Sequence, residues 1–359
     1  KQALGGGQLD SALAVGDAPL AQLHITVRIA DGAALAVNRR ALERELDATL
    51  VTWSDRLRHA LRARHDEAVA AALDRHYARA FPAAYQQDVS PALAVQDIAD
   101  LDSEAARGAG RLRLRLPADA SKTRAHLRLL RHGEPLAISE ALPILESFGL
   151  RVIAERPYEL RPSGGGALWI QDFELETPGL HEADAQALEA QLNIAYTAVL
   201  AGDLDSDGFH RLIVSAGLTV AQTRVLRACC RYLLQTGLPF SQQYMERVLH
   251  SHSHIARELW RLFELRLSPA ATDRRAAREA TAIERRVHHA ISEVRNPDDD
   301  RILRAFLALV QASVRTNYFC DQSGSQPLAF KLLPRLIPGL PEPRPEFEIF
   351  VHGTHVEGV

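Results

Sequence analysis

The spacing of apolar residues changes along this chain, and that change limits the folds open to it. Between residues 112 and 176 apolar and polar residues alternate, as at Leu112, Leu114 and Leu116, and a period of two predicts half-buried strands. From residue 180 to about residue 318 the pattern becomes helical. The sequence therefore predicts an α+β multidomain chain that is mostly helical and has a small antiparallel sheet domain.

The alternating region has the element order of one small layer. Two strands, around Leu112 and Leu127, are followed by a helix that starts near Ser139 and ends at Gly149. After the helix, two more strands are expected at Leu150–Arg161 and Ala167–Glu176, and a hairpin loop at Ser163-Gly164-Gly165-Gly166 joins them. We expect the helix to pack on one face of the sheet.

Helices are expected on both sides of this layer. Before it, a strand at Leu23–Ile29 precedes three expected helices, which are Leu42–Leu61, Glu67–Ala80 and Pro91–Leu101. After it, the expected helices are Glu182–Ala201, Asp207–Ala216, Thr219–Gln235, Ser241–Leu249, His254–Leu265, Arg274–Val294 and Asp299–Tyr318. A proline-rich tail then leads into a strand at Phe347–Val351.

Charge and cysteine content exclude several classes of protein. The 42 basic and 45 acidic side chains give a net charge of -3, which argues against a nucleic-acid partner. No apolar run reaches about 18 residues, so no membrane span is predicted. No signal peptide is recognisable. Three cysteines, Cys229, Cys230 and Cys320, do not make a disulfide framework, so we expect a cytoplasmic protein.

Three motifs are candidates for a metal site, and each has a simpler structural interpretation. Residues 203–208 begin like a calcium loop, but Val214 stands where a bidentate glutamate is needed, so an acidic turn with Asp207 as a helix cap is favoured. His250, His252 and His254 alternate at what looks like a helix junction, where i and i+2 point apart. Adjacent Cys229 and Cys230 are expected to be buried. We therefore expect no metal.

Arginine-rich segments give two further candidates. Arg111, Arg113 and Arg115 lie on one face of an expected strand; a solvated face is favoured over an anion site. Arg315 and Asn317 are polar residues beside aromatics where a long helix is expected to end. Structural capping is favoured there over a functional role.

A complete dinucleotide-dependent active site is not expected. No Gly-x-Gly-x-x-Gly motif follows a strand, because residues 5–7 and 164–166 both fail at the third glycine. Lysine occurs only at Lys1, Lys122 and Lys331, which leaves few amines for catalysis. The chain begins without methionine and ends directly after a strand-like run, so we interpret it as a piece of a longer polypeptide.

Several runs, in order and spacing, resemble the large bacterial NAD-specific glutamate dehydrogenases over nearly all of the chain. The runs are Phe81-Pro82-Ala-Ala-Tyr85, Leu142-Pro143-Ile-Leu-Glu146, Glu155-Arg156-Pro157-Tyr158-Glu159, Trp169-Ile-Gln-Asp172-Phe173, Asp207-Gly208-Phe-His-Arg211, Ala216-Gly217-Leu218, Asp300-Arg301-Ile302-Leu303-Arg304, Arg315-Thr-Asn317-Tyr318-Phe319, Pro343-Arg344-Pro345, Glu348-Ile349-Phe350-Val351 and Val356-Glu357-Gly358.

The resemblance implies a division of the chain and an activity for the parent protein. The implied parts are residues 1–37, the end of an ACT-like unit; 38–109, a helical segment; 110–178, an ACT-like (ferredoxin-like) domain; 179–297, a helical motif; and 298–359, the truncated start of the dehydrogenase domain. The implied parent oxidises L-glutamate with NAD and water to 2-oxoglutarate, ammonia and NADH, in amino-acid catabolism. It is implied to be a homo-oligomer, a tetramer. The catalytic and NAD-binding residues are implied to lie beyond this piece, which is therefore expected to be inactive alone.

The ACT-like domain is the expected place for allosteric regulation by an amino acid. The helix start near Ser139 offers free N–H groups to a carboxylate, Gly133 allows close approach, and Glu134 or Glu140 could meet the ammonium group. By the resemblance, Arg315 and Asn317 are candidates for an entry to the substrate domain, beside the structural role favoured above. A structural or interface role of the ACT-like domain stays open, because a sheet edge could pair with a sister domain. The alternative that the chain is a non-enzymatic amino-acid-sensing and assembly module also stays open.

Overall fold

The computed structural model describes residues 8–14, 22–28, 40, 43, 51–116, 124–176, 185–271, 273–320, 326–354 and 356–359. The chain divides into two compact units, one of residues 1–78 with 89–95 and one of residues 79–88 with 96–359. Within the described ranges no helix is long and apolar enough to cross a membrane.

The described part of the first unit includes a hairpin and the helices α2 and α3. β1 (Gln8–Ala14) pairs antiparallel with β2 (Gln22–Arg28), which confirms the strand predicted around Leu23. α2 (Trp53–Arg64) begins at Thr52, whose side chain forms a capping box with Asp55. α3 (Glu67–Tyr77) is shorter than predicted. The helix expected over Leu42–Leu61 is confirmed from Trp53 onward but not at Val51 and Thr52, where a new helix is capped. Residue 42 and residues 44–50 lie outside the described residues.

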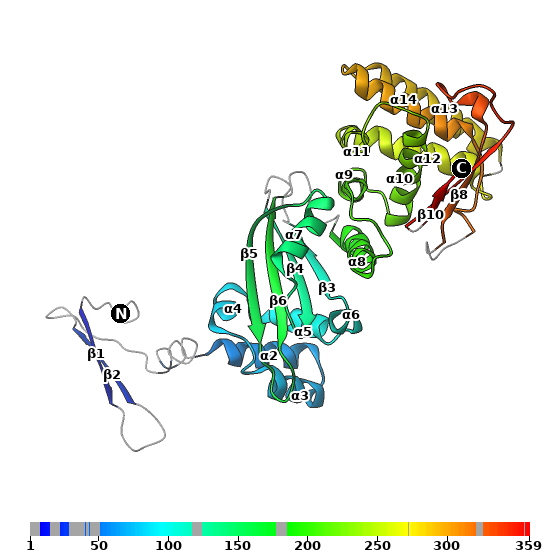
Figure 1. Ribbon diagram of the computed structural model, residues 1–359. Helices are drawn as coiled ribbons and strands as arrows, with labels where there is room; N and C mark the ends of the chain where they lie inside the picture. Colours follow the sequence, from blue (N-terminus) through cyan, green and yellow to red (C-terminus); the bar gives the residue numbers. More distant parts are fainter. Residues whose placement is uncertain are drawn as a thin grey trace. The chain divides into compact units, whose positions relative to one another are not determined.

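The second unit begins with short helices beside a four-stranded sheet (Figure 1). The helices before the sheet are α4 (Ala83–Asp88), α5 (Pro91–Leu101), which is shared between the units and has the predicted bounds, and α6 (Glu104–Arg107). The elements that follow are β3 (Arg111–Arg115), β4 (Arg124–His132), α7 (Ile138–Ser147), β5 (Arg151–Leu160), β6 (Leu168–Glu176) and α8 (Ala185–Ala201).

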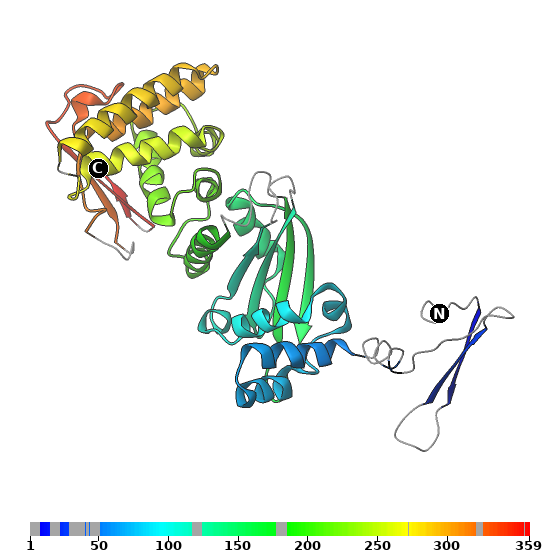
Figure 2. The same cartoon turned by 180° about the vertical axis from the view of Figure 1, so that it is seen from behind.

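The sheet is antiparallel throughout, with strand order β3-β4-β6-β5. α7 lies in front of it in Figure 1 and behind it in Figure 2, so this helix covers one face, as predicted. α8 packs on the same core, with Leu192, Ala195 and Tyr196 buried among Leu127 and Phe173. The order ββαββα is that of the βαββαβ ferredoxin-like unit begun at its second strand, which confirms the predicted fold class. A division of the chain at residue 178 thus separates α8 from the sheet on which it packs.

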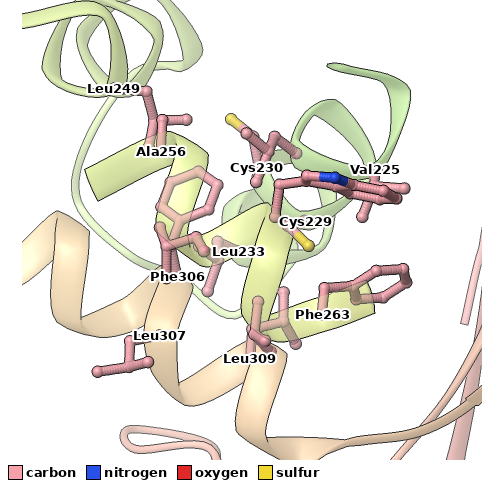
Figure 3. Close-up of a cluster of buried hydrophobic side chains, with 14 of the residues drawn as sticks. Val225, Cys229, Cys230, Leu233, Leu249, Ala256, Phe263, Phe306, Leu307 and Leu309 are labelled. Atoms are coloured by element: carbon pink, nitrogen blue, oxygen red, sulfur yellow. The ribbon is translucent and has the colours of Figure 1, made fainter. Parts of the chain in front are cut away.

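The helical region has its own core. Its elements are the 3₁₀ turn η3 (Gly208–His210), α9 (Arg211–Ser215), α10 (Val220–Gln235), α11 (Gln242–Ser251), α12 (Ser253–Leu267), α13 (Arg274–Ser292) and α14 (Pro297–Ala312). Figure 3 shows Cys229, Leu233, Phe263 and Phe306 within this core. Cys229 and its neighbour Cys230 are buried, as predicted.

A second four-stranded sheet ends the chain. Its elements are β7 (Ser313–Thr316), β8 (Leu328–Leu332), the 3₁₀ turn η4 (Pro334–Leu336), β9 (Glu348–Gly353) and β10 (Val356–Gly358), in the order β10-β9-β8-β7. β9 confirms the strand predicted near Phe347. The single helix predicted over Asp299–Tyr318 was wrong at its end. The helix stops at Ala312 and the chain continues directly as β7, because its backbone groups pair with β8.

Candidate functional site

The residues predicted to hold an amino-acid effector gather at the turn between β4 and α7. Gly133, with φ at +83°, donates its N–H to Ala167 and accepts the Trp169 indole N–H at 3.0 Å. Glu134, Ser139 and Glu140 are exposed around this turn. The structure therefore brings all four predicted residues to one exposed turn.

The start of α7 differs in detail from the prediction. The helix begins at Ile138, so Ser139 lies inside its first turn, and the cap position is Ala137, which has no side-chain acceptor. The backbone N–H groups of this first turn are therefore not satisfied by a side-chain cap, and they are the groups that would meet an anion.

A buried glutamine that sequence reasoning missed holds this turn in place. The Gln171 amide accepts the Leu136 N–H at 2.8 Å and donates to the Leu136 carbonyl at 2.9 Å. It also donates to the Glu155 carboxylate at 2.8 Å. Gln171 is 2% exposed, so its polar groups depend on these partners. The signal that could have indicated it is a polar residue between apolar ones in the run from Trp169 to Phe173.

One edge of the ACT-like sheet is closed by α8. Asn193 accepts the Leu112 N–H at 2.9 Å and donates to the Leu112 carbonyl at 3.0 Å, as a neighbouring strand would. Glu189 accepts the Leu114 N–H at 2.8 Å. The opposite edge is β5, where Pro157, which cannot donate, and 40% exposed Ile153 lie. α8 thus closes the β3 edge and not the β5 edge, and Pro157 leaves the β5 edge with one donor fewer for pairing.

Two of the three arginines of β3, Arg111 and Arg113, are engaged in ion pairs. Arg113 holds Asp100 at 2.5 Å and Glu189 at 2.8 Å, and Arg111 lies 3.5 Å from Glu189. Burial lowers the pKa of Arg115. Carboxylates of α5 and α8 thus pair with Arg111 and Arg113, so these two arginines do not present a free anion site.

The same face of the sheet also covers a buried ionic cluster, since Arg113 and Arg128 are cross-strand partners. Arg128 lies between Asp97 of α5 at 2.7 Å and Asp172 of β6 at 3.0 Å. His126 contacts Asp172 at 2.9 Å, and the Tyr85 hydroxyl donates to Asp97 at 2.5 Å. Burial raises the pKa of Asp172, but His126 and Arg128 outweigh it, so the net shift is downward. These groups satisfy one another, and the cluster ties α5 to the sheet.

A second buried cluster joins α7 to the helical region. Arg227 of α10, 3% exposed, holds both oxygens of Asp207 at 2.6 and 2.8 Å. The same guanidinium lies 3.3 Å from His210 Nε2, and His210 Nδ1 lies 3.3 Å from the Ser147 hydroxyl of α7. Burial, and secondly Arg227, lower the pKa of His210 to about 4. Asp207 also caps η3, as predicted, by accepting the Phe209 N–H.

The far end of α10 is fixed to the C-terminal sheet. The Tyr232 hydroxyl donates to Glu348 of β9 at 2.5 Å. Arg231 lies 2.9 Å from Glu357 of β10, and Gln235 donates to Glu357 at 2.7 Å. At the start of the same helix, the Val220 N–H donates to Gln191 of α8 at 2.9 Å. One helix of 16 residues, about 24 Å long, therefore contacts both α8 and β9.

Arg315 and Asn317 differ in their surroundings: Asn317 is bonded to neighbouring backbone, and Arg315 is exposed. The Asn317 amide donates to the Pro327 carbonyl at 2.9 Å and accepts the Ala329 N–H at 2.8 Å, so it binds the chain leading into β8. Arg315 is exposed on β7. Asn317 thus has the structural role that was favoured, although it lies after a strand and not at a helix end.

The histidine and cysteine motifs have ordinary protein partners. His250 lies 3.2 Å from the Ser215 hydroxyl, and His252 lies 3.2 Å from Asp299 at the junction of α11 and α12. Burial raises the pKa of the Cys229 thiol to about 12. Among the residues that the structure describes, no group of three or more His, Cys, Asp and Glu side chains is placed to hold a metal ion.

Five family models match the chain in sequence order. They are the glutamate dehydrogenase ACT2 domain at residues 1–54, helical motif 2 at 60–103, the ACT3 domain at 110–188, helical motif 3 at 204–269, and the catalytic domain of bacterial NAD-glutamate dehydrogenase at 286–359.

Three curated relatives match nearly the whole chain, and each bears the name NAD-specific glutamate dehydrogenase. The chain is 36% identical to that of Halomonas elongata over 346 residues, 95% of the chain and 21% of the relative. It is 33% identical to that of Pseudomonas aeruginosa, again over 95% of the chain and 21% of the relative. It is 37% identical to that of Mycobacterium tuberculosis over 99% of the chain and 23% of the relative. The chain thus spans about a fifth of the length of these relatives.

Proposed function

Because this chain belongs to the family of NAD-specific glutamate dehydrogenases, we propose that it is the segment linking the amino-acid-sensing half of such an enzyme to its dehydrogenase half. The whole enzyme converts L-glutamate, NAD and water to 2-oxoglutarate, ammonia and NADH. It works in the cytoplasm as a homotetramer. NAD and substrate bind outside this segment, which serves regulation and assembly.

The observation that supports this role is the pair of contacts made by α10. At its start α10 bonds to α8, which packs on the ACT-like sheet, and at its end it bonds to β9 and β10. β9 and β10 lie in the part matched by the catalytic-domain model. A displacement of α8 by a ligand or a partner subunit therefore has a direct path, through one rigid helix, to the dehydrogenase sheet.

Two sites are proposed for the regulatory input. The turn formed by Gly133, Glu134, Ser139 and Glu140 binds the carboxylate and ammonium of an amino acid, supported by the uncapped start of α7. The β5 edge pairs with a sister domain in the oligomer, supported by the closure of the β3 edge by Asn193. Calorimetric titration of the enzyme with common amino acids separates the two, since only the first gives saturable heat that Glu140→Gln weakens.

Inactivity of the isolated chain follows from its composition. A glutamate dehydrogenase site needs amines to hold carboxylates and to polarise a carbonyl, and this chain has three scattered lysines. Arg315, exposed on β7, is proposed as a cation at the entry to the substrate domain, and Asn317 positions β8 beside it.

The test compares the 359-residue chain with the complete gene product that contains it. Glutamate-dependent NADH formation is followed at 340 nm with both proteins free of host enzyme. We expect activity from the complete protein and none from the chain alone. An inactive complete protein that still binds amino acids would instead support a non-enzymatic sensing module. Activity in the 359-residue chain would overturn the proposal.

A further inference from the structure

A hollow with a volume of about 410 Å³ lies beside α12, away from the α7 turn. Its walls come from α12, α13 and the turn at Gly217 between α9 and α10. Its apolar wall includes Trp260 and Ile283, which are both buried. This volume falls in the range of pockets that hold small organic molecules.

Charged side chains line the remainder of this hollow, and two of its arginines are already paired. Arg286 holds Glu258 at 2.6 Å. Arg261 lies 3.0 Å from Glu264 and 3.0 Å from Glu279. Two carboxylates therefore share one guanidinium, which leaves negative charge on this side of the hollow.

The third arginine of the hollow, Arg257, has a backbone partner and no carboxylate partner among the described residues. Arg257 donates its Nε–H to the Ala216 carbonyl at 2.6 Å, and its Nη2 lies against Gly217, 3.6 Å from where a Cβ would stand. Within the described part of the chain, no carboxylate lies within 4.0 Å of its guanidinium nitrogens. The hollow thus contains one guanidinium in excess near Gly217 and one carboxylate in excess near Arg261.

We propose that this hollow binds a free L-α-amino acid. The α-carboxylate pairs with Arg257, whose planar guanidinium suits a carboxylate. The α-ammonium pairs with a carboxylate oxygen that Arg261 does not contact, Oε1 of Glu264 or Oε2 of Glu279, and the ligand's side chain packs on Trp260 and Ile283. Because the paired side chains are between one-third and three-fifths exposed, water weakens each ion pair, and we expect a dissociation constant of about 1 mM.

This site goes beyond the proposed function and does not depend on it, since binding can be measured without catalysis. The test is saturation-transfer NMR of the 359-residue chain with each of the twenty common L-amino acids, followed by titration of the best one. We expect saturable binding, weakened at least tenfold when the probe is replaced by its N-acetyl or its carboxamide form. Equal binding of these forms, or no saturable binding by any amino acid, would refute the site.

Variants locate the binding. Arg257→Gln and Glu279→Gln are each expected to weaken it at least tenfold, and Arg257→Lys less than Arg257→Gln. Arg266→Gln is the matched control, because Arg266 is also an exposed α12 arginine that donates to a backbone carbonyl, that of Gln311. It should leave binding unchanged.

Folding is checked separately, because Arg257 supports the Ala216 backbone. Thermal melting by circular dichroism identifies any loss of structure in Arg257→Gln, and Glu279→Gln remains decisive because it removes a charge without removing a backbone contact. Binding that survives both variants but is lost in Glu140→Gln would place the ligand at the α7 turn and overturn the proposal.

Discussion

Replacing Asp207 by asparagine should destabilise the helical region strongly. Asp207 holds both nitrogens of a guanidinium that is 3% exposed, at 2.6 and 2.8 Å. Asparagine caps a helix about as well as aspartate, so the N-terminus of η3 keeps its acceptor. The substitution therefore removes the negative charge opposite Arg227, and it replaces the oxygen that accepts the Arg227 Nε–H with an NH2 donor. Leaving one partner of a buried ion pair alone costs about 3–5 kcal/mol.

The assay is urea unfolding followed by circular dichroism, with hydrogen exchange of α10 peptides to localise the effect. We expect a loss of about 3–5 kcal/mol in the free energy of unfolding, or about 6–20 °C in melting temperature for a region of this size. Asp205→Asn is the control, because Asp205 lies exposed in the same turn and its loss should cost less than about 0.5 kcal/mol. If the two variants lose equal stability, Asp207 is a helix cap and its pair with Arg227 contributes nothing measurable.

Asn193→Ala removes two hydrogen bonds to β3, so it should lower the free energy of unfolding by about 1–3 kcal/mol. It should also increase association measured by light scattering, because the β3 edge loses its cover. The control, Gln186→Ala on the exposed face of α8, should change neither quantity. The pKa of His210 is about 4 when folded and 6.5 when unfolded, so the unfolded state binds more protons between these values. Lowering the pH from 7.5 to 4.5 should therefore cost wild type up to about 3 kcal/mol more than the His210→Gln variant, measured by urea unfolding. Iodoacetamide at pH 8 should modify exposed Cys320 in the native protein and Cys229 only after unfolding, because burial raises the pKa of that thiol to about 12; peptide mass spectrometry reads both sites.

The sequence predicted elements well where the local pattern agrees with the tertiary packing. α5 has the predicted bounds, and the strands β5 and β6 flank the predicted glycine-rich hairpin. The strand β7, directly after α14, was harder to predict from the sequence. Ser313 continues directly from the helix without glycine or proline, and β7 exists because its four residues pair with β8. A strand of that length has too few residues to show a period of its own.

The polar side chains that shape the candidate sites were not predictable, because their partners are distant in sequence. Gln171 bonds to a residue 35 positions away, and Asn193 to one 81 positions away. Gln171 bonds to the backbone of Leu136, and Asn193 bonds to the outer edge of β3, the side that has no neighbouring strand. The glycine at position 133 and the acidic turn around Asp207 were predictable, since turn chemistry and helix capping depend on nearby residues.

Closure of the β3 edge by α8 also has a consequence for synthesis on the ribosome. β3 begins at Arg111 and α8 ends at Ala201, so 90 further residues are added before the edge can be covered. At about 5–20 residues per second, that interval lasts about 5–18 s. During it β4 can pair with one side of β3, but the outer edge of β3 stays uncovered and can meet other copies emerging from the same polysome. Asp100 of α5, which precedes β3, can already pair with Arg113, and Glu189 of α8 later pairs with both Arg111 and Arg113.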